Sequence, residues 1–468
     1  MSIASAVRGS GAGRVLRDEI RATVALSIPI ALTQIAQMSL NTTDVVMTGR
    51  LGPAALAAGQ LGHSLFFPMY ITVIGVLFAT AAMFAQEIGA GRYKGVRRTA
   101  RQGFWVILSL TGPAWLYFWH AEWILVHVLG QDPALAARAG EYADGAMWGF
   151  PFMAGFSLLR NFIAAHSRPR AALYILAVGI VINAAADWVL MFGEFGLPRL
   201  ELYGLGLATS IVQTAMFLGL LALVLRDRRW RRYHILVRFW RPDWPRYREV
   251  WAVGLPIGLT KLAESGLFAA SGFLVGLIGA EALAGHAVAI QYTAISFMVP
   301  FGIAQAATVR VGLAVGRGNF EAARRAGRVA MVVGVLVVLP MALLFVTAGE
   351  TLARLFLDGG DASGAASIAY AASFLAMAGL FQIADGGQAV TAGALRGFKD
   401  TRVPMVIAVV GYWAFGIGGA AVLAFPLGFG GVGVWGGLAL GLAVVWAALV
   451  LRFRTVTAAR SVPQPMAS

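Results

Sequence analysis

Long apolar segments recur along the whole of this 468-residue chain, and they constrain its fold more than any other feature. Each is about 20 residues or longer, which is the length an α-helix needs to cross a lipid bilayer. Apolar residues make up 59% of the chain and charged residues only 13%, whereas about 25% of a soluble protein is charged. The sequence therefore predicts an all-α polytopic membrane protein.

We predict twelve transmembrane helices, and the even number places both termini on one side of the membrane. Thirty lysines and arginines lie in the termini and connections on that side, and only Arg50, Arg138, Arg199 and Arg354 lie in connections on the other. Because cytoplasmic segments carry the excess of basic residues, both termini are expected in the cytoplasm. The expected ranges are 23–48, 56–87, 103–119, 140–163, 172–193, 204–225, 251–277, 283–311, 329–347, 368–394, 404–425 and 433–451.

The net charge of +15 does not indicate a nucleic-acid partner, because the basic residues follow the membrane topology. The most basic stretch, Arg226–Glu249, reads as a cytoplasmic linker held near anionic lipid by arginine and tryptophan. The chain has no cysteine, which excludes disulfides and thiolate metal sites. Its richness in alanine, glycine and arginine suggests a bacterial source, and hence the bacterial inner membrane.

The chain contains an internal repeat. One constant offset in residue number relates "LSIPIALTQ" (Leu26–Gln34) to "VGLPIGLTK" (Val253–Lys261), and "GAGRYKGVRRTAR" (Gly89–Arg101) to "GRGNFEAARRAGR" (Gly316–Arg328). Six spans per half give the halves one orientation, so the repeats are parallel. We expect two pseudo-symmetric six-helix bundles around a central cleft: an N-lobe at 1–225, a basic linker at 226–250 and a C-lobe at 251–468.

A polar stripe runs along the first predicted span. Its members are spaced three or four residues apart, which places them on one helical face: Gln34, Gln37, Asn41, Asp44 and Thr48. Polar groups in a span face the bundle interior, where water or partners satisfy them. Asp44 is therefore expected to line a cavity rather than to face lipid.

Further acids lie in other predicted spans. Lys261 and Glu264 continue the repeat of the stripe on the seventh span, one turn apart. Asp187 shares a helical face with Asn183, and Asp385 lies between Gln382 and Gln388, three residues from each. Lys261 is an internal counter-ion of Glu264, or it snorkels towards the membrane surface, or it lines the cleft.

A charged carboxylate at the centre of a span costs about 2.5–3.5 kcal/mol. Four such groups must therefore hold protons, bind cations or find cationic partners. A site that exchanges H⁺ or Na⁺ for a cationic substrate needs carboxylates that can be neutralised in either way. We expect Asp44, Asp187, Glu264 and Asp385 to serve in such exchange.

The chain resembles the multidrug and toxic compound extrusion (MATE) family, and its NorM-like branch in particular. The resemblance covers essentially the whole chain. It is carried by "GHAVAIQYTAISFMVPFGIAQAATVRVGLAVGRG" (Gly285–Gly318), "AGALRGFKDTRVPM" (Ala392–Met405) and "VWGGLALGL" (Val434–Leu442). It implies twelve helices in two lobes and a cation-coupled exporter of varied organic, often cationic, compounds.

The resemblance also implies site residues. The family's cation-site positions fall on Asp44, Asn183, Asp187 and Thr209 in the N-lobe, and on Glu264 and Asp385 in the C-lobe. Gln291 and Tyr292 are weaker candidates for the cleft. NorM-like members often have an amide at the position of Asp187, and the acid found here is more like the DinF-like branch. Either set could hold Na⁺, and both H⁺ and Na⁺ stay open as the coupling ion, as does the lobe that holds it.

The sequence predicts a secondary active multidrug efflux antiporter that works by rocker-switch alternating access. Its partners would be small cationic amphipathic compounds and membrane lipid, with no nucleic acid and no cofactor beyond the coupling ion, H⁺ or Na⁺. We expect a monomer. Two alternatives remain: a lipid-linked saccharide flippase, whose cleft should be cationic, and a membrane-embedded enzyme, which should expose polar catalytic loops.

Overall fold

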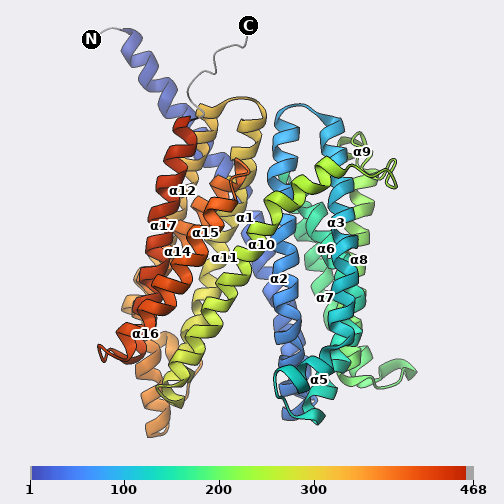
Figure 1. The fold of residues 1–468 in the computed structure, drawn as a ribbon, viewed down its shortest axis with the longest axis vertical. Helices are drawn as coiled ribbons and strands as arrows, with labels where there is room; N and C mark the ends of the chain where they lie inside the picture. The colour runs from blue at the N-terminus through green and yellow to red at the C-terminus, as the bar shows by residue number, and fades with distance from the viewer. Residues whose placement is uncertain (1–2, 460–468) are drawn as a thin grey trace. The chain divides into compact units, whose positions relative to one another are not determined.

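A computed structural model describes residues 3–459, with side chains from residue 13 onward. All its regular secondary structure in this range is helical (Figure 1). The side chain of Arg8 and the whole of Arg460, both included in the charge count, lie outside the described part.

The first half of the chain contains eight α-helices before the linker. They are α1 (Ile3–Arg50), α2 (Pro53–Gly89), α3 (Tyr93–Trp119), α4 (Ala121–Trp123), α5 (Pro133–Ala146), α6 (Phe150–Ala165), α7 (Arg170–Phe192) and α8 (Glu201–Arg226), with the short helices η1 (Ile124–Val128), η2 (Met147–Gly149) and η3 (Glu194–Gly196) between them.

The second half repeats this arrangement after α9. Its elements are α9 (Arg228–Arg231), α10 (Trp244–Gly276), α11 (Ala280–Gly316), α12 (Phe320–Thr347), α13 (Gly349–Ala353), α14 (Ala362–Gly397), α15 (Arg402–Val410), η4 (Gly411–Ile417), α16 (Gly418–Ala424) and α17 (Gly430–Ala459).

All twelve predicted spans fall on helices, and none of them extends past the end of its helices by more than a single residue. The fourth span is built from α5, η2 and α6, and the eleventh from α15, η4 and α16. Within residues 13–459, nine helical segments are long and apolar enough to cross a membrane by themselves. The helical spans therefore form as the apolar pattern predicts.

The repeat seen in the sequence is also a repeat of structure. The constant offset that relates the two halves of the sequence carries both ends of α2 onto the ends of α11, and the start of α3 onto the start of α12. The turn between each pair contains a glycine with positive φ: 67° at Gly91 and 71° at Gly318. Glycine has no Cβ and tolerates this left-handed conformation, so the same residue closes the same turn in both halves.

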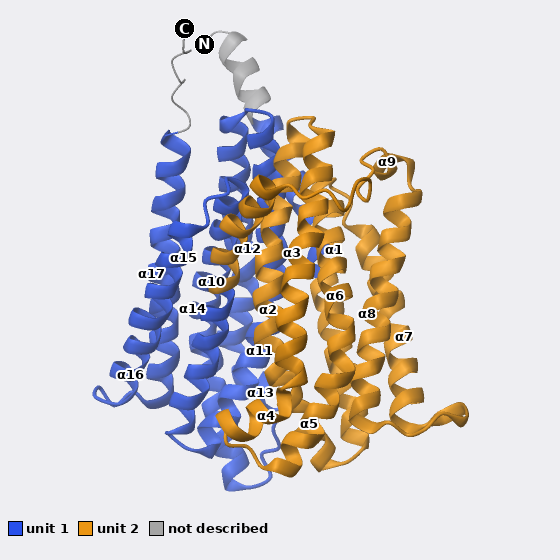
Figure 2. Ribbon diagram, turned by 45° about the vertical axis from the view of Figure 1, so that its right-hand side comes forward, with its two compact units in different colours: residues 1–31, 260–468 blue, residues 32–259 orange. Residues whose placement is uncertain are grey.

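The described chain divides into two compact units (Figure 2). Unit 1 contains residues 1–31 and 260–468, and unit 2 contains residues 32–259. The division falls inside helices α1 and α10, so each of these helices begins in one unit and ends in the other. The division into lobes at 1–225 and 251–468 stays a prediction.

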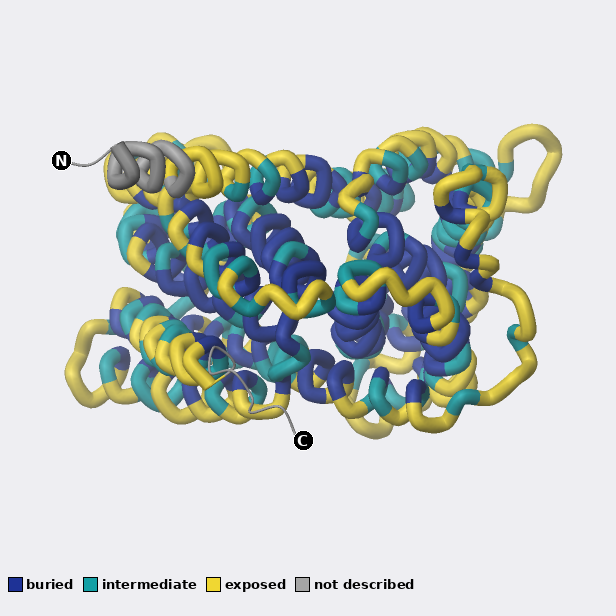
Figure 3. The backbone as a smooth tube through the Cα atoms, turned by 90° about the horizontal axis from the view of Figure 1, so that it is seen from above, coloured by how far each residue is buried: buried dark blue, intermediate teal, exposed yellow. Residues whose placement is uncertain are grey.

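Unit 1 is organised around α11 and α14, which pack against each other, with α12 and α17 packed on α14. Its core includes the fully buried rings of Phe374, Tyr412 and Trp435. In unit 2, α8 packs on α5 and α7, and α2 packs on α6 and α3. In both units the connecting loops are mostly exposed (Figure 3).

Large apolar side chains on the outer helix faces are exposed in the protein alone. Val181 on α7 is 70% exposed, Phe273 on α10 is 80% exposed and Leu343 on α12 is 64% exposed. Soluble proteins rarely expose so many large apolar groups together. These faces are therefore suited to contact lipid acyl chains.

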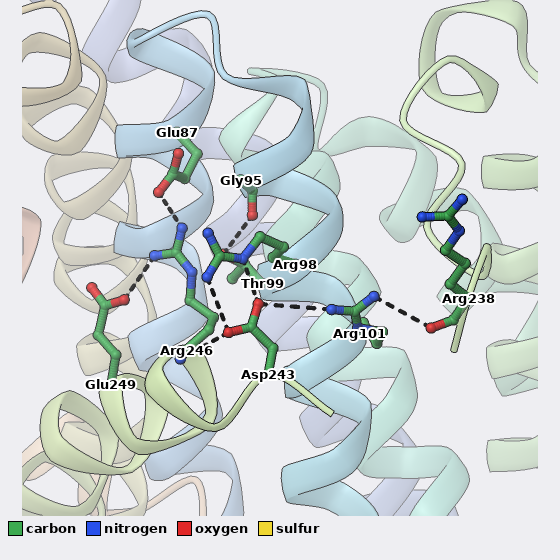
Figure 4. Close-up of polar contacts among 9 residues, drawn as sticks. All are labelled: Glu87, Gly95, Arg98, Thr99, Arg101, Arg238, Asp243, Arg246 and Glu249. Atoms are coloured by element: carbon green, nitrogen blue, oxygen red, sulfur yellow. Dashed lines mark hydrogen bonds and ion pairs between the residues drawn. The ribbon is translucent and has the colours of Figure 1, made fainter. Parts of the chain in front are cut away.

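Within unit 2, ion pairs join the basic linker and the start of α10 to α2 and α3 (Figure 4). Asp243 accepts hydrogen bonds from the guanidinium of Arg98 on α3, which holds the pKa of that carboxyl below its ordinary value. Arg246, at the start of α10, pairs with Glu87 on α2 and with Glu249, the latter at 2.7 Å. Arg246 and Glu87 are both nearly buried. The first turns of α10 are thus fixed to the ends of α2 and α3.

Candidate cation-coupling site

The polar stripe on α1 contacts partners within unit 2. Gln34 and Gln37 each accept a hydrogen bond from Nη1 of Arg160 on α6, at 2.8 and 3.1 Å. Asp44, three turns beyond Gln34 on α1, is half-buried and contacts Asn183 on α7. The stripe therefore faces polar side chains of neighbouring helices, as its spacing suggests.

Asn183 joins two carboxylates. Its side-chain Nδ2 donates to Oδ1 of Asp44 at 2.7 Å and to Oδ2 of Asp187 at 2.6 Å. Asp187 is completely buried, and its second oxygen, Oδ1, has no hydrogen-bond partner among the described residues. No cation pairs with either acid in that part of the chain. The arrangement leaves one buried acceptor oxygen and a surplus of negative charge for a proton or a metal cation to satisfy.

A cavity of about 80 Å³ lies beside Asp44. One water takes about 30 Å³, so the cavity has room for two or three waters or a small hydrated ion. It reaches α1, α2, α5 and α8, and its lining residues are Asn41, Asp44, Val45, Thr48, Leu56, Gly59, Gln60, His63, Tyr142 and Leu205. The carboxylate of Asp44 thus lies at the wall of a water-sized space.

Thr209 on α8 has a hydroxyl that donates to its own helix, to the carbonyl oxygen of Leu205 at 3.1 Å. Its oxygen lone pairs stay free to accept a cation or a proton donor. Thr209 is half-buried and makes no hydrogen bond to Asp44 or Asp187 in the described structure. Its membership of the cation site stays a prediction.

In unit 1, Glu264 and Asp385 have different partners from the acids of unit 2. Nζ of Lys261 pairs with Oε2 of Glu264 at 2.7 Å, and both side chains are nearly buried. The same ammonium lies 5.7 and 5.5 Å from the ring centroids of Phe297 and Phe301 on α11, within cation–π range. Of the three roles considered for Lys261, this ion pair favours that of an internal counter-ion of Glu264.

Asp385 on α14 hydrogen-bonds an amide and forms no ion pair with a described residue. Its Oδ1 accepts from Nε2 of Gln388 at 3.2 Å, and Oε1 of Gln388 accepts from the hydroxyl of Tyr412 at 3.0 Å. Tyr412 lies in η4, a π-helical turn, and π-helical turns occur frequently at functional sites. The sequence pattern did not point to Tyr412, because periodicity does not predict π-helical turns.

The remaining cleft candidates are dispersed. Gln382 hydrogen-bonds Ser296 of α11 and is buried. The hydroxyl of Tyr292 donates to the carbonyl oxygen of Leu352 at 3.0 Å, and its ring packs on Phe356. Gln291 is exposed. The described structure does not bring Gln291 or Tyr292 into hydrogen bonding with Glu264 or Asp385.

The two units therefore differ in charge balance. In unit 2, Asp44 and Asp187 share an amide and have no cationic partner among the described residues. In unit 1, Lys261 neutralises Glu264, so of the two acids predicted within the spans of this unit only Asp385 forms no ion pair with a described residue. The larger unbalanced charge lies in unit 2.

Comparison with known proteins places the chain in a family. The MatE family model matches residues 29–189 and 256–422, one segment in each half. A probable multidrug resistance protein NorM of Mesorhizobium japonicum is 47% identical over 439 residues, covering 93% of this chain and 94% of the relative. A protein of the same name from Brucella suis is 43% identical over 438 residues, with 93% of each chain covered.

Solved structures show the same fold. An outward-facing multidrug resistance MATE family transporter of the MOP superfamily superposes with a TM-score of 0.86 at 21% identity, over 95% of this chain and 97% of that one. The eukaryotic MATE transporter AtDTX14 gives 0.82 at 21% identity, over 95% and 98%. These likenesses confirm the twelve-helix, all-α membrane fold. By its sequence and its fold, the chain belongs to the MatE family, which is a family of transporters and not of enzymes.

Proposed function

We propose that this MatE transporter is a secondary active multidrug efflux antiporter, which exports organic, often cationic, amphipathic compounds in exchange for H⁺ or Na⁺. Relatives that match over most of the chain carry the name multidrug resistance protein, which supports the class of substrate. Alternating access by a rocker-switch movement follows from the parallel repeat.

The observation that carries the coupling step is the carboxylate pair joined by Asn183. Two acids that share one amide donor, with a buried oxygen left unbonded, are stable only when a proton or a cation neutralises part of their charge. An organic cation that binds near the same two carboxylates competes with that proton or metal ion. Competition of this kind couples export of the organic cation to entry of the proton or metal ion.

We place the coupling ion in unit 2. Asp44, Asn183 and Asp187 are already assembled there, and carboxylate and amide oxygens suit Na⁺ as well as a proton. Glu264 in unit 1 is occupied by Lys261, so Asp385 remains the second candidate. The proposal includes a monomer in the bacterial inner membrane with both termini in the cytoplasm, as the basic connections indicate.

The test uses the purified protein in liposomes. Uptake of a fluorescent organic cation is followed under a pH gradient without Na⁺, and then under a Na⁺ gradient at uniform pH. We expect uptake under one gradient, and that gradient identifies the ion. Asp187→Asn should abolish uptake and Asp385→Asn should reduce it. The matched control is Asp358→Asn, which changes an exposed acid in a loop of unit 1 and should transport normally.

Uptake by the wild type that survives in Asp187→Asn would refute the coupling role of the pair. If Asp385→Asn loses uptake and Asp187→Asn does not, the coupling ion would be assigned to unit 1. An absence of uptake under both gradients would contradict antiport, and flipping of a fluorescent lipid would then be measured in the same vesicles.

A further inference from the structure

Three arginines at the start of α3 recur at the start of α12. The constant offset of the repeat relates Arg97, Arg98 and Arg101 to Arg324, Arg325 and Arg328. Both sets lie on the predicted cytoplasmic side, in the connection that precedes a predicted span. Because the two sets occupy equivalent positions, the partners of the first indicate which kind of group the second can bind.

In unit 2 the linker provides acceptors for all three arginines of α3. Nε of Arg97 donates to the carbonyl oxygen of Tyr233 at 2.9 Å. The carboxylate of Asp243 accepts a hydrogen bond from Nη2 of Arg98 at 3.0 Å and lies 3.7 Å from Nη2 of Arg101 (Figure 4). The set on α3 is therefore matched by a carbonyl group and a carboxylate of the linker.

In unit 1 the equivalent arginines have no such partner. None of the three forms a side-chain hydrogen bond or an ion pair with a described residue. Arg324 and Arg325 are half-buried, and Nε of each is buried without an acceptor in the described structure. Removing part of a guanidinium from water without an acceptor costs free energy, which a neighbouring oxyanion offsets. The two half-buried arginines are therefore suited to bind an anion.

The acids of the connections around α12, α14 and α17 do not neutralise these arginines. Asp400, between α14 and α15, already accepts a hydrogen bond from Nε of Arg452 at 2.8 Å. Glu321, in the first turn of α12, is exposed and forms no ion pair in the described structure. Residues 460–468, which follow α17, contain no aspartate or glutamate. Further basic residues of the same connections are Arg317, Arg396, Lys399, Arg402 and Arg454. An anion from outside the chain is therefore the partner that this charge favours.

The exposed face of α12 continues from the arginines into the predicted span (Figure 1). Exposed apolar residues follow Arg328 at spacings of four, four, three and four: Val332, Leu336, Leu339 and Leu343. These spacings place the five residues on one face of the helix. Because Arg328 directly precedes the predicted span 329–347, the charged end of this face lies at the level of lipid headgroups. Its apolar part lies at the level of acyl chains.

We propose that Arg324, Arg325 and Arg328 bind the phosphate of an anionic phospholipid, whose acyl chains lie along this exposed face of α12. Guanidinium groups match phosphate oxygens in a bidentate manner, and basic pockets at the cytoplasmic ends of membrane helices bind anionic headgroups. A zwitterionic phospholipid fits less well, because its headgroup adds a cation to a cluster that already has an excess of positive charge. The lipid phosphate takes the place in unit 1 that the linker carboxylate has in unit 2. The site goes beyond the proposed export function and uses none of the carboxylates assigned to coupling.

The test counts the lipids bound to the full-length protein by native mass spectrometry in detergent. Phosphatidylglycerol and phosphatidylcholine with the same acyl chains are titrated separately, and the dissociation constant of the tightest-bound lipid is measured. We expect the wild type to bind phosphatidylglycerol more tightly. The double variant Arg324→Gln with Arg325→Gln should weaken phosphatidylglycerol binding by about tenfold or more and leave phosphatidylcholine binding unchanged. Arg324→Lys with Arg325→Lys, which keeps the charge but not the planar fork, should give an intermediate affinity.

The matched control is Arg168→Gln with Arg170→Gln. Both of these arginines are exposed and lie on the predicted cytoplasmic side, so the control removes the same amount of charge from that side. It should leave the affinity for the tightest-bound phosphatidylglycerol at the wild-type value. An equal loss of affinity in the two double variants would indicate a general attraction of anionic lipid to a basic surface, and would refute a site on α12.

Arg328→Glu tests the site even if the double variant does not fold, because it reverses a single exposed charge. It should also weaken phosphatidylglycerol binding, and an unchanged affinity would overturn the proposal. Equal binding of the two phospholipids by the wild type would do the same. Displacement of phosphatidylglycerol by an equal concentration of glycerol 3-phosphate would assign the arginines to a soluble phosphate instead. Tight binding seen only in a chain that ends at Ala459 would assign them to residues 460–468. None of these measurements requires transport, so their outcome is independent of the proposed export function.

Discussion

The bridge made by Asn183 leads to a quantitative prediction about stability. Asn183→Ala removes both hydrogen bonds, at 2.7 and 2.6 Å, and leaves Asp44 and Asp187 without the amide donor that they share. A hydrogen bond to a charged group contributes about 1.5–3 kcal/mol, so the two together contribute about 3–6 kcal/mol. Asp187 is fully buried, so water does not replace the lost donor.

Thermal unfolding of the purified protein in detergent at pH 7 measures the loss. With an unfolding entropy of about 2.1 cal/mol/K per residue, a chain of this length changes its Tm by about 1 °C for each kcal/mol. We expect Asn183→Ala to lower the Tm by about 3–6 °C. The control is Thr209→Val, which removes only a bond within one helix and should lower the Tm by less than about 1 °C.

A second substitution tests the cause. Asp187→Asn in the Asn183→Ala background removes one of the two acids, so it should recover at least half of the lost stability. A melting temperature of Asn183→Ala equal to that of the wild type would refute the reasoning. So would a double variant whose loss is the sum of the two single losses, because interacting neighbours are not additive.

Three further outcomes follow from the contacts. Gly75→Ala places a Cβ 2.7 Å from the α10 backbone. In thermal unfolding this variant should destabilise unit 2 by about 1–3 kcal/mol. The control is Gly112→Ala, whose Cβ meets no atom within 4 Å and which should leave the stability unchanged. Asp243→Asn removes the ion pair between the linker and Arg98 of α3. Hydrogen bonding to Arg98 lowers the pKa of Asp243 in the folded state. This contact therefore stabilises the folded protein at a pH above the ordinary carboxylate pKa of about 3.9. The stabilisation is lost as the pH falls below that value. The Tm difference between variant and wild type should therefore be full at about pH 6 and shrink as the pH falls below about 3.9 towards the lower pKa of the folded state. Lys261→Met leaves Glu264 buried without its partner and should cost about 3–5 kcal/mol, measured by denaturation, and Lys261→Met with Glu264→Gln should restore most of it.

Much of the fold could be predicted from the sequence because the bilayer limits the choices. Backbone polar groups in lipid must be satisfied internally, so an apolar segment of sufficient length is a helix. For this reason all twelve predicted spans are helices, and the constant offset between the two halves of the sequence reappears in the bounds of α2 and α11. The charge pattern that orients the chain is equally a property of the sequence, although it stays a prediction here.

The candidate site was predictable only in part. Spacings of three and four residues place Gln34, Gln37 and Asp44 on one face of α1, which is a local property of a helix. The same spacing pairs Lys261 with Glu264. Neither spacing says which residues of other helices meet that face, because this depends on how the helices pack.

The tertiary structure alone decided which residues of other helices each polar group contacts. It placed Asn183 between Asp44 and Asp187, brought Tyr412 to Gln388 through a π-helical turn, and set Arg160 against the glutamines of α1. It also divided the described chain into two units, with the divisions inside α1 and α10. Hydrophobic periodicity determines which side of a helix avoids lipid, and it carries no information on which neighbour lies there. That choice comes from packing between segments far apart in the sequence, and the chemistry of the site depends on it.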